Sequence, residues 1–403
     1  MITGKKQWIS KLLFLILIMS VVALPIMNVS AENIDIQTAA QDEAKNQIES
    51  LLTKGFTPYY DILGLETEIT RVDENEDSLD IYTLTTMNNV LRAKAVTELP
   101  HVQGMLKAVK LNDLKQDSLE NTVKAIQANK DIQMEDIQVE RAAKLLQFKI
   151  RDVEPYIGKP DETNFVFKFT VKKVKDGIDP VTAVLLVENI DKYVPAETII
   201  PESSEEMINN GIEEIMTGIN DVRLDKTYID DKTVNPTLYP YYNRIDARDY
   251  ANTYTSNATK YCSHGSALQD TSFWNTSTYP AFLGNFCHND CADYVSQSLA
   301  YGGIPKDSTW TRSSANNSWT YAWQNCNGLK KYMYDTKSYW ALSDYTNAAA
   351  GGVIMYKNSD GSYYHTVMIV KNDTVSRQFS GHTNDRKQYG YGNSSGCEYY
   401  ILW

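Results

Sequence analysis

Residues 289–303 read Asn-Asp-Cys-Ala-Asp-Tyr-Val-Ser-Gln-Ser-Leu-Ala-Tyr-Gly-Gly. Asp290 is a favourable helix N-cap, and the Gly-Gly pair at the end is typical of a helix stop. Cys291, Val295 and Leu299 then fall on one face, because residues four apart lie on the same side of a helix. The stretch therefore predicts a partly buried helix that begins with a cysteine.

A thiol in the first turn of a helix is well placed for nucleophilic chemistry. The free N–H groups and the helix dipole favour the thiolate there, which lowers the pKa of a cysteine below its usual ~8.5. Such a nucleophile also needs a base. Residues 352–356 and 363–370 predict two strands around a turn at 358–361, and the second strand carries His365. An antiparallel sheet packed against the helix would pair His365 with Cys291.

A third polar group must orient the imidazole of such a pair. His382 follows a short strand expected at residues 374–379, one strand beyond His365. The residue types alone leave the choice open. The candidates are His382, Asn384, Asp385 and Asp373.

The motifs of this region, taken in order, resemble the putative amidase domain family of secreted bacterial proteins. Residues 290–297 with Gly302-Gly303 match a family core that typically shows Asp-Cys-(Thr)-Asn-Phe-Val-Ser-Gln and then Gly-Gly. The resemblance covers roughly residues 239–403. Its other matches are Tyr242-Asn243-Arg244, Ala247, Tyr250 and Ala251 upstream, and Ser318-Trp319-Thr320, His365 and His382-Thr383 downstream.

This family is similar to the NlpC/P60 and CHAP groups, which are papain-like cysteine hydrolases. The resemblance implies an α+β domain with the cysteine at a helix N-terminus and the histidine on an antiparallel sheet. It implies Cys291 as nucleophile, His365 as base and His382 as the orienting residue. Residues expected near the oxyanion or the substrate are Asp290, Tyr242 and Asn243.

Three features depart from the family pattern. Asp293 stands where Asn is expected, and Gly352 where an Asp commonly precedes the strand that leads to the histidine. Residues 262–286 form a longer connection than usual, which would reshape a substrate cleft. None of the three removes the proposed Cys–His pair.

The other cysteines allow two interpretations. Four remain besides Cys291, and in a secreted chain they form two disulfides in one of three pairings, or some stay buried thiols. They are Cys262, Cys287, Cys326 and Cys397. A zinc site built on Cys287-His288-x-x-Cys291 would need further ligands such as Cys262 or His264. The helix pattern explains Cys291 better, so we expect neither a metal nor another cofactor.

Residues 1–31 predict a secretory signal peptide. Three lysines precede an apolar run at 12–27, and Val29-Ser30-Ala31 offers small residues at the cleavage positions. The run is shorter than the ~18–20 residues that a spanning helix needs. We therefore expect cleavage after Ala31 and a secreted mature chain without a transmembrane segment.

Residues 32–220 predict a separate, acidic α+β domain. Residues 32–235 carry 39 Asp or Glu against 23 Lys or Arg, and all five cysteines lie after residue 235. A long helix followed by strands is compatible with a cystatin-like shape, and residues 221–238 are expected to form a linker. Periodicity predicts helices at 36–56, 118–127, 134–147 and 203–219, and strands at 65–72, 78–84, 164–174 and 181–187.

The whole chain has the composition of a soluble globular protein, with 42% hydrophobic and 22% charged residues. Its net charge of −12 argues against nucleic acid as a partner. The sequence therefore predicts a secreted cysteine amidase or peptidase, with cell-wall peptides as the expected substrate. The alternative is a non-catalytic secreted protein that uses the same fold to bind the cell wall.

Overall fold

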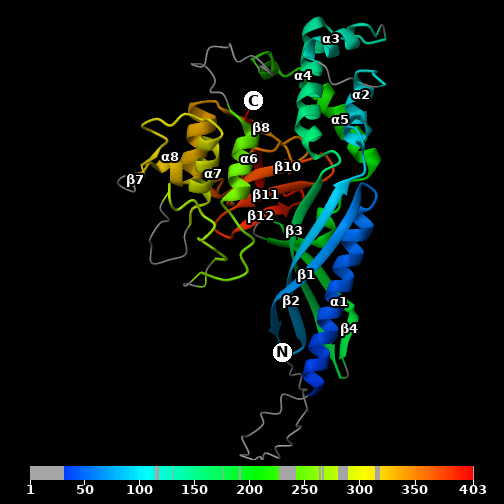
Figure 1. The fold of residues 1–403 in the computed structure, drawn as a ribbon, viewed down its shortest axis with the longest axis vertical. Helices are drawn as coiled ribbons and strands as arrows, with labels where there is room; N and C mark the ends of the chain where they lie inside the picture. The colour runs from blue at the N-terminus through cyan, green and yellow to red at the C-terminus, as the bar shows by residue number, and fades with distance from the viewer. Residues whose placement is uncertain are drawn as a thin grey trace, which may run out of the picture.

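The structure, a computed structural model, is an α+β protein (Figure 1). It describes residues 31–226 except 113, 115–117, 130, 176, 190 and 191, and residues 242–402 except 263, 264, 266, 280–288 and 314–317. The expected signal peptide, apart from Ala31, lies outside the described residues. Among the helices that the structure describes, none is long and apolar enough to cross a membrane.

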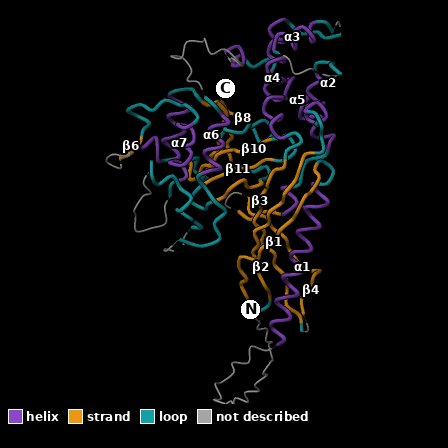
Figure 2. The backbone as a smooth tube through the Cα atoms, in the orientation of Figure 1, coloured by secondary structure: helices purple, strands orange, loops and turns teal. Residues whose placement is uncertain are grey.

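One eleven-stranded sheet joins the two regions that the sequence distinguishes (Figure 2). The strand order is β1-β2-β3-β12-β11-β10-β9-β13-β8, with β4 pairing β3 and β5 pairing β4. The N-terminal strands are β1 (Tyr60–Glu74), β2 (Ser78–Leu91), β3 (Pro160–Val174), β4 (Gly177–Asn189) and β5 (Lys192–Pro195). The C-terminal strands are β8 (Trp340–Ser343), β9 (Val353–Lys357), β10 (Tyr363–Asn372), β11 (Arg377–Gly381), β12 (Arg386–Gly390) and β13 (Cys397–Leu402).

The two regions meet where β3 lies beside β12. This contact is parallel and pairs Tyr389 with Asn164, whereas the other neighbouring strands run antiparallel. Asn164 strengthens it by donating a 3.1 Å hydrogen bond from its side chain to the backbone oxygen of Lys387. The acidic region and the region with the cysteines therefore share a backbone-bonded sheet.

Helix α1 (Ala31–Phe56) packs along the N-terminal strands (Figure 1). Its buried Ala40 and Ala44 meet Ile81 of β2 and Phe169 of β3. The small alanines let the helix approach the sheet, and the larger strand residues fill the space between them. The strand alternation predicted at residues 164–174 is confirmed in β3.

A helical cluster lies at one end of these strands (Figure 1). It consists of α2 (Pro100–Ala108), α3 (Leu119–Gln127), α4 (Asp136–Val153) and α5 (Ser204–Gly218). The short helix η4 (Val222–Lys226) belongs to the same core, because Leu224 is buried in it and Asp225 pairs with Arg141 of α4. The start of the expected linker is thus part of the N-terminal region, and residues 227–238 lie outside the described residues.

The C-terminal helices cover one face of strands β8–β13. They are α6 (Arg244–Thr253), α7 (Cys291–Tyr301), α8 (Tyr321–Gln324) and α9 (Cys326–Lys330), followed by a π-helical turn at Lys331–Thr336. A two-stranded ribbon, β6 (Arg312–Ser313) and β7 (Ser318–Trp319), precedes α8. On β10, Met368 and Val370 face α7, whereas Val367 and Ile369 belong to the core on the opposite face.

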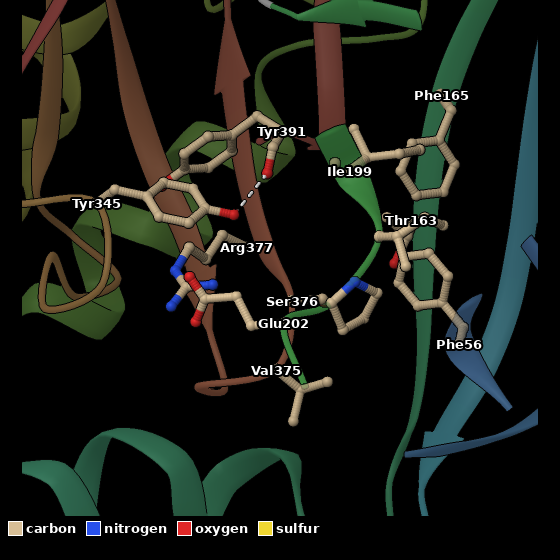
Figure 3. A pocket seen from close by; sticks show the side chains of 13 residues that line it. Phe56, Thr163, Phe165, Ile199, Glu202, Tyr345, Val375, Ser376, Arg377 and Tyr391 are labelled. Carbon is tan, nitrogen blue, oxygen red and sulfur yellow. Dashed lines mark hydrogen bonds between the residues drawn. The ribbon is translucent and has the colours of Figure 1, made fainter. Parts of the chain in front are cut away.

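Side chains from both regions line a small cavity where the regions meet (Figure 3). Phe165 and Ile199 approach it from the N-terminal region, and Tyr345 and Arg377 from the C-terminal region. The Arg377 guanidinium lies 4.1 Å from the ring centroid of Tyr345. This boundary is packed with buried side chains, as in a protein interior.

Candidate active site

Helix α7 begins at Cys291, as the sequence predicts. Asp290 occupies the N-cap position, but its side chain makes no capping hydrogen bond. Its carboxylate instead lies 2.9 Å from the Nδ1 atom of His382. The expectation of a side-chain cap was therefore wrong, because the buried imidazole is the stronger partner for a carboxylate at this place.

Cys291 lies near His365, which stands near the start of β10. The thiol is 7% exposed, and the imidazole of His365 and the backbone N–H of Thr366 both help to lower its pKa. His365 is half-buried, and its ring stacks on Tyr356 of β9 with 5.4 Å between centroids. The fold thus brings together a helix-terminal thiol and an imidazole that are 74 positions apart in the sequence.

A second thiol lies beside Cys291. Helix α9 begins at Cys326, and the Asn325 side chain caps it by accepting a 3.2 Å hydrogen bond from the N–H of Gly328. The Sγ atoms of Cys326 and Cys291 are 3.7 Å apart, and both side chains are buried. The first residues of two helices therefore present their sulfur atoms to each other.

The two thiols differ in acidity. The pKa of Cys291 lies well below the usual value, chiefly because Cys326 donates a hydrogen bond to it; burial opposes this, and His365 and the N–H of Thr366 lower it further. The pKa of Cys326 is raised well above the usual value by the same hydrogen bond, by burial and by the negative charge of Cys291. Both shifts make Cys291 the more acidic thiol of the pair.

Asn327, next to Cys326, fixes the strand that carries His365. Its Nδ2 atom donates a 3.2 Å hydrogen bond to the carbonyl of Tyr363, and its Oδ1 atom accepts a 2.9 Å bond from the N–H of Tyr363. The side-chain amide thus pairs with one strand residue as a neighbouring strand would. The dipeptide 326–327 touches the thiol through one side chain and the start of β10 through the other.

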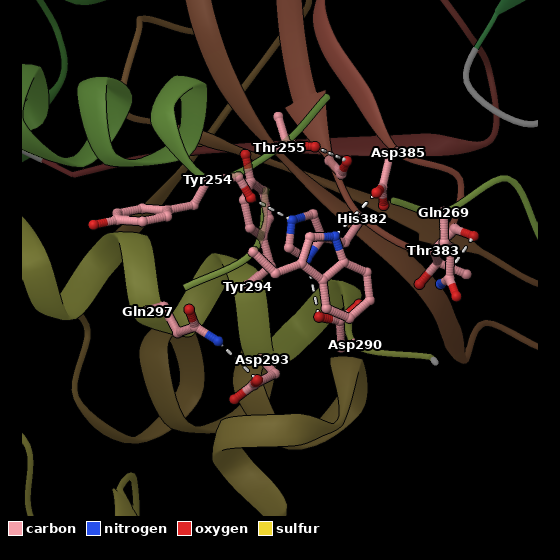
Figure 4. Close-up of polar contacts among 12 residues, drawn as sticks. Tyr254, Thr255, Gln269, Asp290, Asp293, Tyr294, Gln297, His382, Thr383 and Asp385 are labelled. Atoms are coloured by element: carbon pink, nitrogen blue, oxygen red, sulfur yellow. Dashed lines mark hydrogen bonds and ion pairs between the residues drawn. The ribbon is translucent and has the colours of Figure 1, made fainter. Parts of the chain in front are cut away.

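His382 lies in a separate buried cluster beside the start of α7 (Figure 4). Its Nδ1 atom is bonded to Asp290, and its Nε2 atom donates a 2.7 Å hydrogen bond to the carbonyl of Tyr254. The ring is stacked between Trp274 and Tyr294, with centroids 4.3 and 4.0 Å away. Burial opposes its charge, but Asp290 raises the pKa of His382 above its ordinary value.

Both ring nitrogens of His382 therefore have partners other than His365. The remaining candidates for the orienting residue are also bound elsewhere. Asn384 accepts the N–H of Leu268, Asp385 accepts the N–H of Asp270 and the indole N–H of Trp274, and Asp373 accepts the hydroxyl of Tyr60. Within the described residues, none of these four candidates therefore bonds the imidazole of His365, and His382 is bound to Asp290 and Tyr254 instead.

Tyr242 and Asn243 lie at the other end of α7. The hydroxyl of Tyr242 bonds the carbonyl of Gly351, and the N–H of Asn243 bonds the carbonyl of Gly302, where α7 ends. A helix of 11 residues is about 16 Å long, which separates them from Cys291 by that distance. They hold the helix rather than line the space around the thiol.

Asp293 has a structural environment that the sequence did not reveal. Its carboxylate accepts hydrogen bonds from Arg312, from the indole of Trp323 and, at 2.8 Å, from Gln297. Burial raises the pKa of Asp293 to about 6, against the opposing charge of Arg312. Asp293 stands where the family pattern has Asn. The buried Arg312 beside it explains the difference, because a carboxylate can neutralise the guanidinium and an amide cannot.

The four cysteines besides Cys291 agree with the second interpretation, in which some stay thiols. Cys262 is disulfide-bonded, whereas Cys326 is a buried thiol and Cys397 a partly buried one, so the expectation of two disulfides was wrong. Cys287 lies outside the described residues. Within the part of the chain that the structure describes, no group of three or more His, Cys, Asp or Glu side chains is arranged to hold a metal ion.

Sequence reasoning did not assign a role to Cys326 or Asn327 at the site. The signal that would have pointed to Cys326 is local: Asn325 is a favourable cap directly before a cysteine, as Asp290 is before Cys291. A search for every cysteine at a predicted helix start would have found both. No comparable local signal exists for Asn327, because its partner Tyr363 lies 36 positions away.

Comparison with known proteins gives a partial match. Residues 241–399 match the model of a family described as "Putative amidase domain", which supports an amidase or other hydrolase function. The chain is also similar to the "Uncharacterized protein YhbB" of Bacillus subtilis (strain 168), with 32% identity over 109 residues. That match covers 25% of this chain and 34% of the relative, so the chain spans about a third of the relative's length. No solved structure matches the chain.

Proposed function

We propose that the protein is a secreted cysteine amidase or peptidase that hydrolyses amide bonds in cell-wall peptides. The position of Cys291 at the start of α7, together with the lowering of its thiol pKa by the nearby His365, carries this proposal. A thiolate at a helix start with an imidazole in reach is the arrangement that nucleophilic attack on a carbonyl requires. The family match of residues 241–399 supports amide hydrolysis as the reaction class.

The reaction begins with attack of the Cys291 sulfur on the amide carbonyl carbon. Backbone N–H groups at the start of α7, including that of Cys291, stabilise the oxyanion that forms. His365, which has taken the thiol proton of Cys291, gives that proton to the leaving amine, and the C–N bond breaks to leave a thioester. His365 then takes a proton from water, whose oxygen attacks the thioester and releases Cys291 and the carboxylic acid.

The same proposal includes a papain-like arrangement for the C-terminal region. It is supported by a cysteine at the start of α7, by α7 packed on β10, and by the antiparallel pairing of β10 with β9 and β11. For the N-terminal region, α1 packed along strands β1–β4 supports a cystatin-like element with additional helices α2–α5. Secretion rests on the signal-peptide pattern of residues 1–31.

The decisive experiment is a digest of purified peptidoglycan, with the released muropeptides identified by mass spectrometry. We expect the wild type to release cleaved peptides, and Cys291→Ala or His365→Ala to lower the rate by about 10⁴-fold or more. Cys397→Ala is the matched control, because it removes a thiol outside the Cys291–Cys326 pair. Full activity of Cys291→Ala would falsify the mechanism, and wall binding without turnover by the wild type would favour the non-catalytic alternative.

A further inference from the structure

We propose that Cys291 and Cys326 form an oxidative modification site, at which a hydroperoxide converts the two thiols into a reversible disulfide. The inference deepens the proposed function, because it rests on Cys291 as the reactive thiolate. It assigns to Cys326 the role of the resolving thiol. The site combines a reactive sulfur, a second sulfur within reach and a rigid support for both.

The distance between the sulfur atoms allows the bond. The Sγ atoms are 3.7 Å apart, and a disulfide of about 2.05 Å requires them to approach by only about 1.6 Å. Each cysteine is the first residue of its helix, so rotation of a side chain there moves the sulfur without disturbing the hydrogen bonds of the helix interior.

The support of α9 keeps Cys326 in reach. Asn325 caps the helix on one side of this cysteine, and Asn327 on the other side bonds both backbone groups of Tyr363. Cys326 is 5% exposed and Cys291 7%. Large oxidants therefore have poor access to the two sulfur atoms. Hydrogen peroxide, which is close to water in size, has better access.

The chemistry follows from the unequal acidity of the thiols. The Cys291 thiolate attacks one oxygen of the peroxide; the O–O bond breaks, hydroxide leaves, and Cys291 becomes a sulfenic acid. Cys326 sulfur then attacks the sulfur of Cys291; the S–O bond breaks, and the hydroxyl group leaves as water with the thiol proton of Cys326. The two sulfurs are oxidised by two electrons in all, the peroxide is reduced, and a dithiol reverses the change by thiol–disulfide exchange.

The modification would block and protect the nucleophile at once. In the disulfide, Cys291 has no thiolate to attack a substrate carbonyl. Without a resolving thiol, the sulfenic acid is open to further oxidation to sulfinic acid, which dithiols do not reverse. Cys326 thus turns an irreversible loss into a recoverable one.

The test is to treat the full chain with hydrogen peroxide, block the remaining thiols and map the peptides under non-reducing conditions by mass spectrometry. We expect a linked Cys291–Cys326 peptide in the wild type and in the control Cys397→Ser. In Cys326→Ser we expect sulfinic acid at Cys291 instead. After dithiothreitol, iodoacetamide should again label Cys291 in the wild type, and much less of it in Cys326→Ser.

Oxidation of Cys291 in the wild type without a linked peptide would overturn the proposal, and this measurement needs no variant to fold. Equal yields of sulfinic acid in the wild type and Cys326→Ser would overturn it as well. The mapping does not depend on hydrolysis. A linked peptide in a protein that cleaves no amide would therefore refute the proposed function alone, and cleavage without a linked peptide would refute the modification site alone.

Discussion

Tyr60 in β1 donates a 2.6 Å hydrogen bond from its hydroxyl to the carboxylate of Asp373, which follows β10. The same carboxylate lies 2.9 Å from the Nζ atom of Lys371, which is also 2.6 Å from Asp161 in β3. Lys371 is 2% exposed. A buried charge that loses its partner lowers the free energy of unfolding. Because Lys371 of the C-terminal region pairs with Asp161 of the N-terminal region, each region stabilises the other.

A fragment that starts at Pro236 should therefore be much less stable than the whole chain. It would leave Lys371 without Asp161 and Arg386 without Glu188, and would expose the edge of β12 that lies beside β3. Urea unfolding followed by tryptophan fluorescence, with the full chain as reference, measures the difference. A fragment as stable as the whole chain would contradict this expectation, and one more active than the whole would identify residues 32–235 as an inhibitor.

Asn327→Leu should weaken the pairing of Cys291 with His365. The leucine can neither donate to nor accept from the backbone of Tyr363, so the start of β10 loses its fixed position. We expect the rate of iodoacetamide labelling of Cys291 at pH 7 to fall by about tenfold and its pH midpoint to rise. Asn327→Asp keeps the acceptor for the N–H of Tyr363, and should change the rate less.

The matched control for this variant is Asn358→Ala in the turn between β9 and β10. The Asn358 side chain bonds only the hydroxyl of Ser362 among the described residues, and does so at an exposed position. Its removal should leave the labelling of Cys291 unchanged. An Asn327→Leu profile that coincides with that of Asn358→Ala would show that the amide does not position the strand.

Asp293→Asn should destabilise the protein although Asn is the residue expected from the family pattern. An asparagine cannot neutralise Arg312, whose side chain is buried, and an unpaired buried charge costs about 3–5 kcal/mol. Thermal and urea unfolding at pH 7 measure the loss. The double variant Asp293→Asn with Arg312→Met should recover much of it, because methionine leaves no charge to pair; equal stability of Asp293→Asn and wild type would refute the account.

Glu214 should make the N-terminal region sensitive to acid. Its carboxylate lies 2.6 Å from Nε2 of His101 and 3.1 Å from Nζ of Lys149, which joins α2, α4 and α5. Burial opposes ionisation, but Lys149 and His101 lower the pKa of Glu214 to about 2. An unfolded Glu titrates near ~4.3, so the stabilisation, about 3 kcal/mol, is present above that pH and is lost as the pH falls towards 2.

The matching experiment compares Glu214→Gln with Glu213→Gln, a change at the exposed neighbouring position. Glu214→Gln should lower the free energy of unfolding at pH 7, and its difference from the wild type should shrink between pH 4 and pH 2. Glu213→Gln should follow the wild type throughout. A constant difference at all pH values would mean that the charge of Glu214 is not what stabilises the cluster.

Periodicity in the sequence predicted most individual elements because it depends on residues close together in the chain. The helix spacing at 36–56 corresponds to α1, and the alternation at 164–174 to β3. The same kind of pattern predicted the helix that starts at Cys291 and the strand that carries His365. Each of these needs only ten to twenty residues of context.

Relations between distant segments were not predictable in this way. Nothing in the alternation of residues 164–174 shows that this strand will lie beside residues 386–390, because a pattern gives the buried face of a strand and not its neighbour. Asp290 illustrates the same limit. Its residue type and position predicted a side-chain helix cap. The carboxylate instead bonds a buried histidine 92 positions later in the sequence.

The sheet order also has a consequence for the time course of synthesis. β12 and β13 come from residues 386–402, yet β12 lies between β3 and β11, and β13 between β9 and β8. Strands made much earlier have unpaired edges until these late residues leave the ribosome, and unpaired edges favour aggregation. The chain therefore has to be kept unfolded or protected from aggregation until nearly all of it is synthesised. A chain truncated before residue 386 lacks β12 and β13 and cannot complete the sheet.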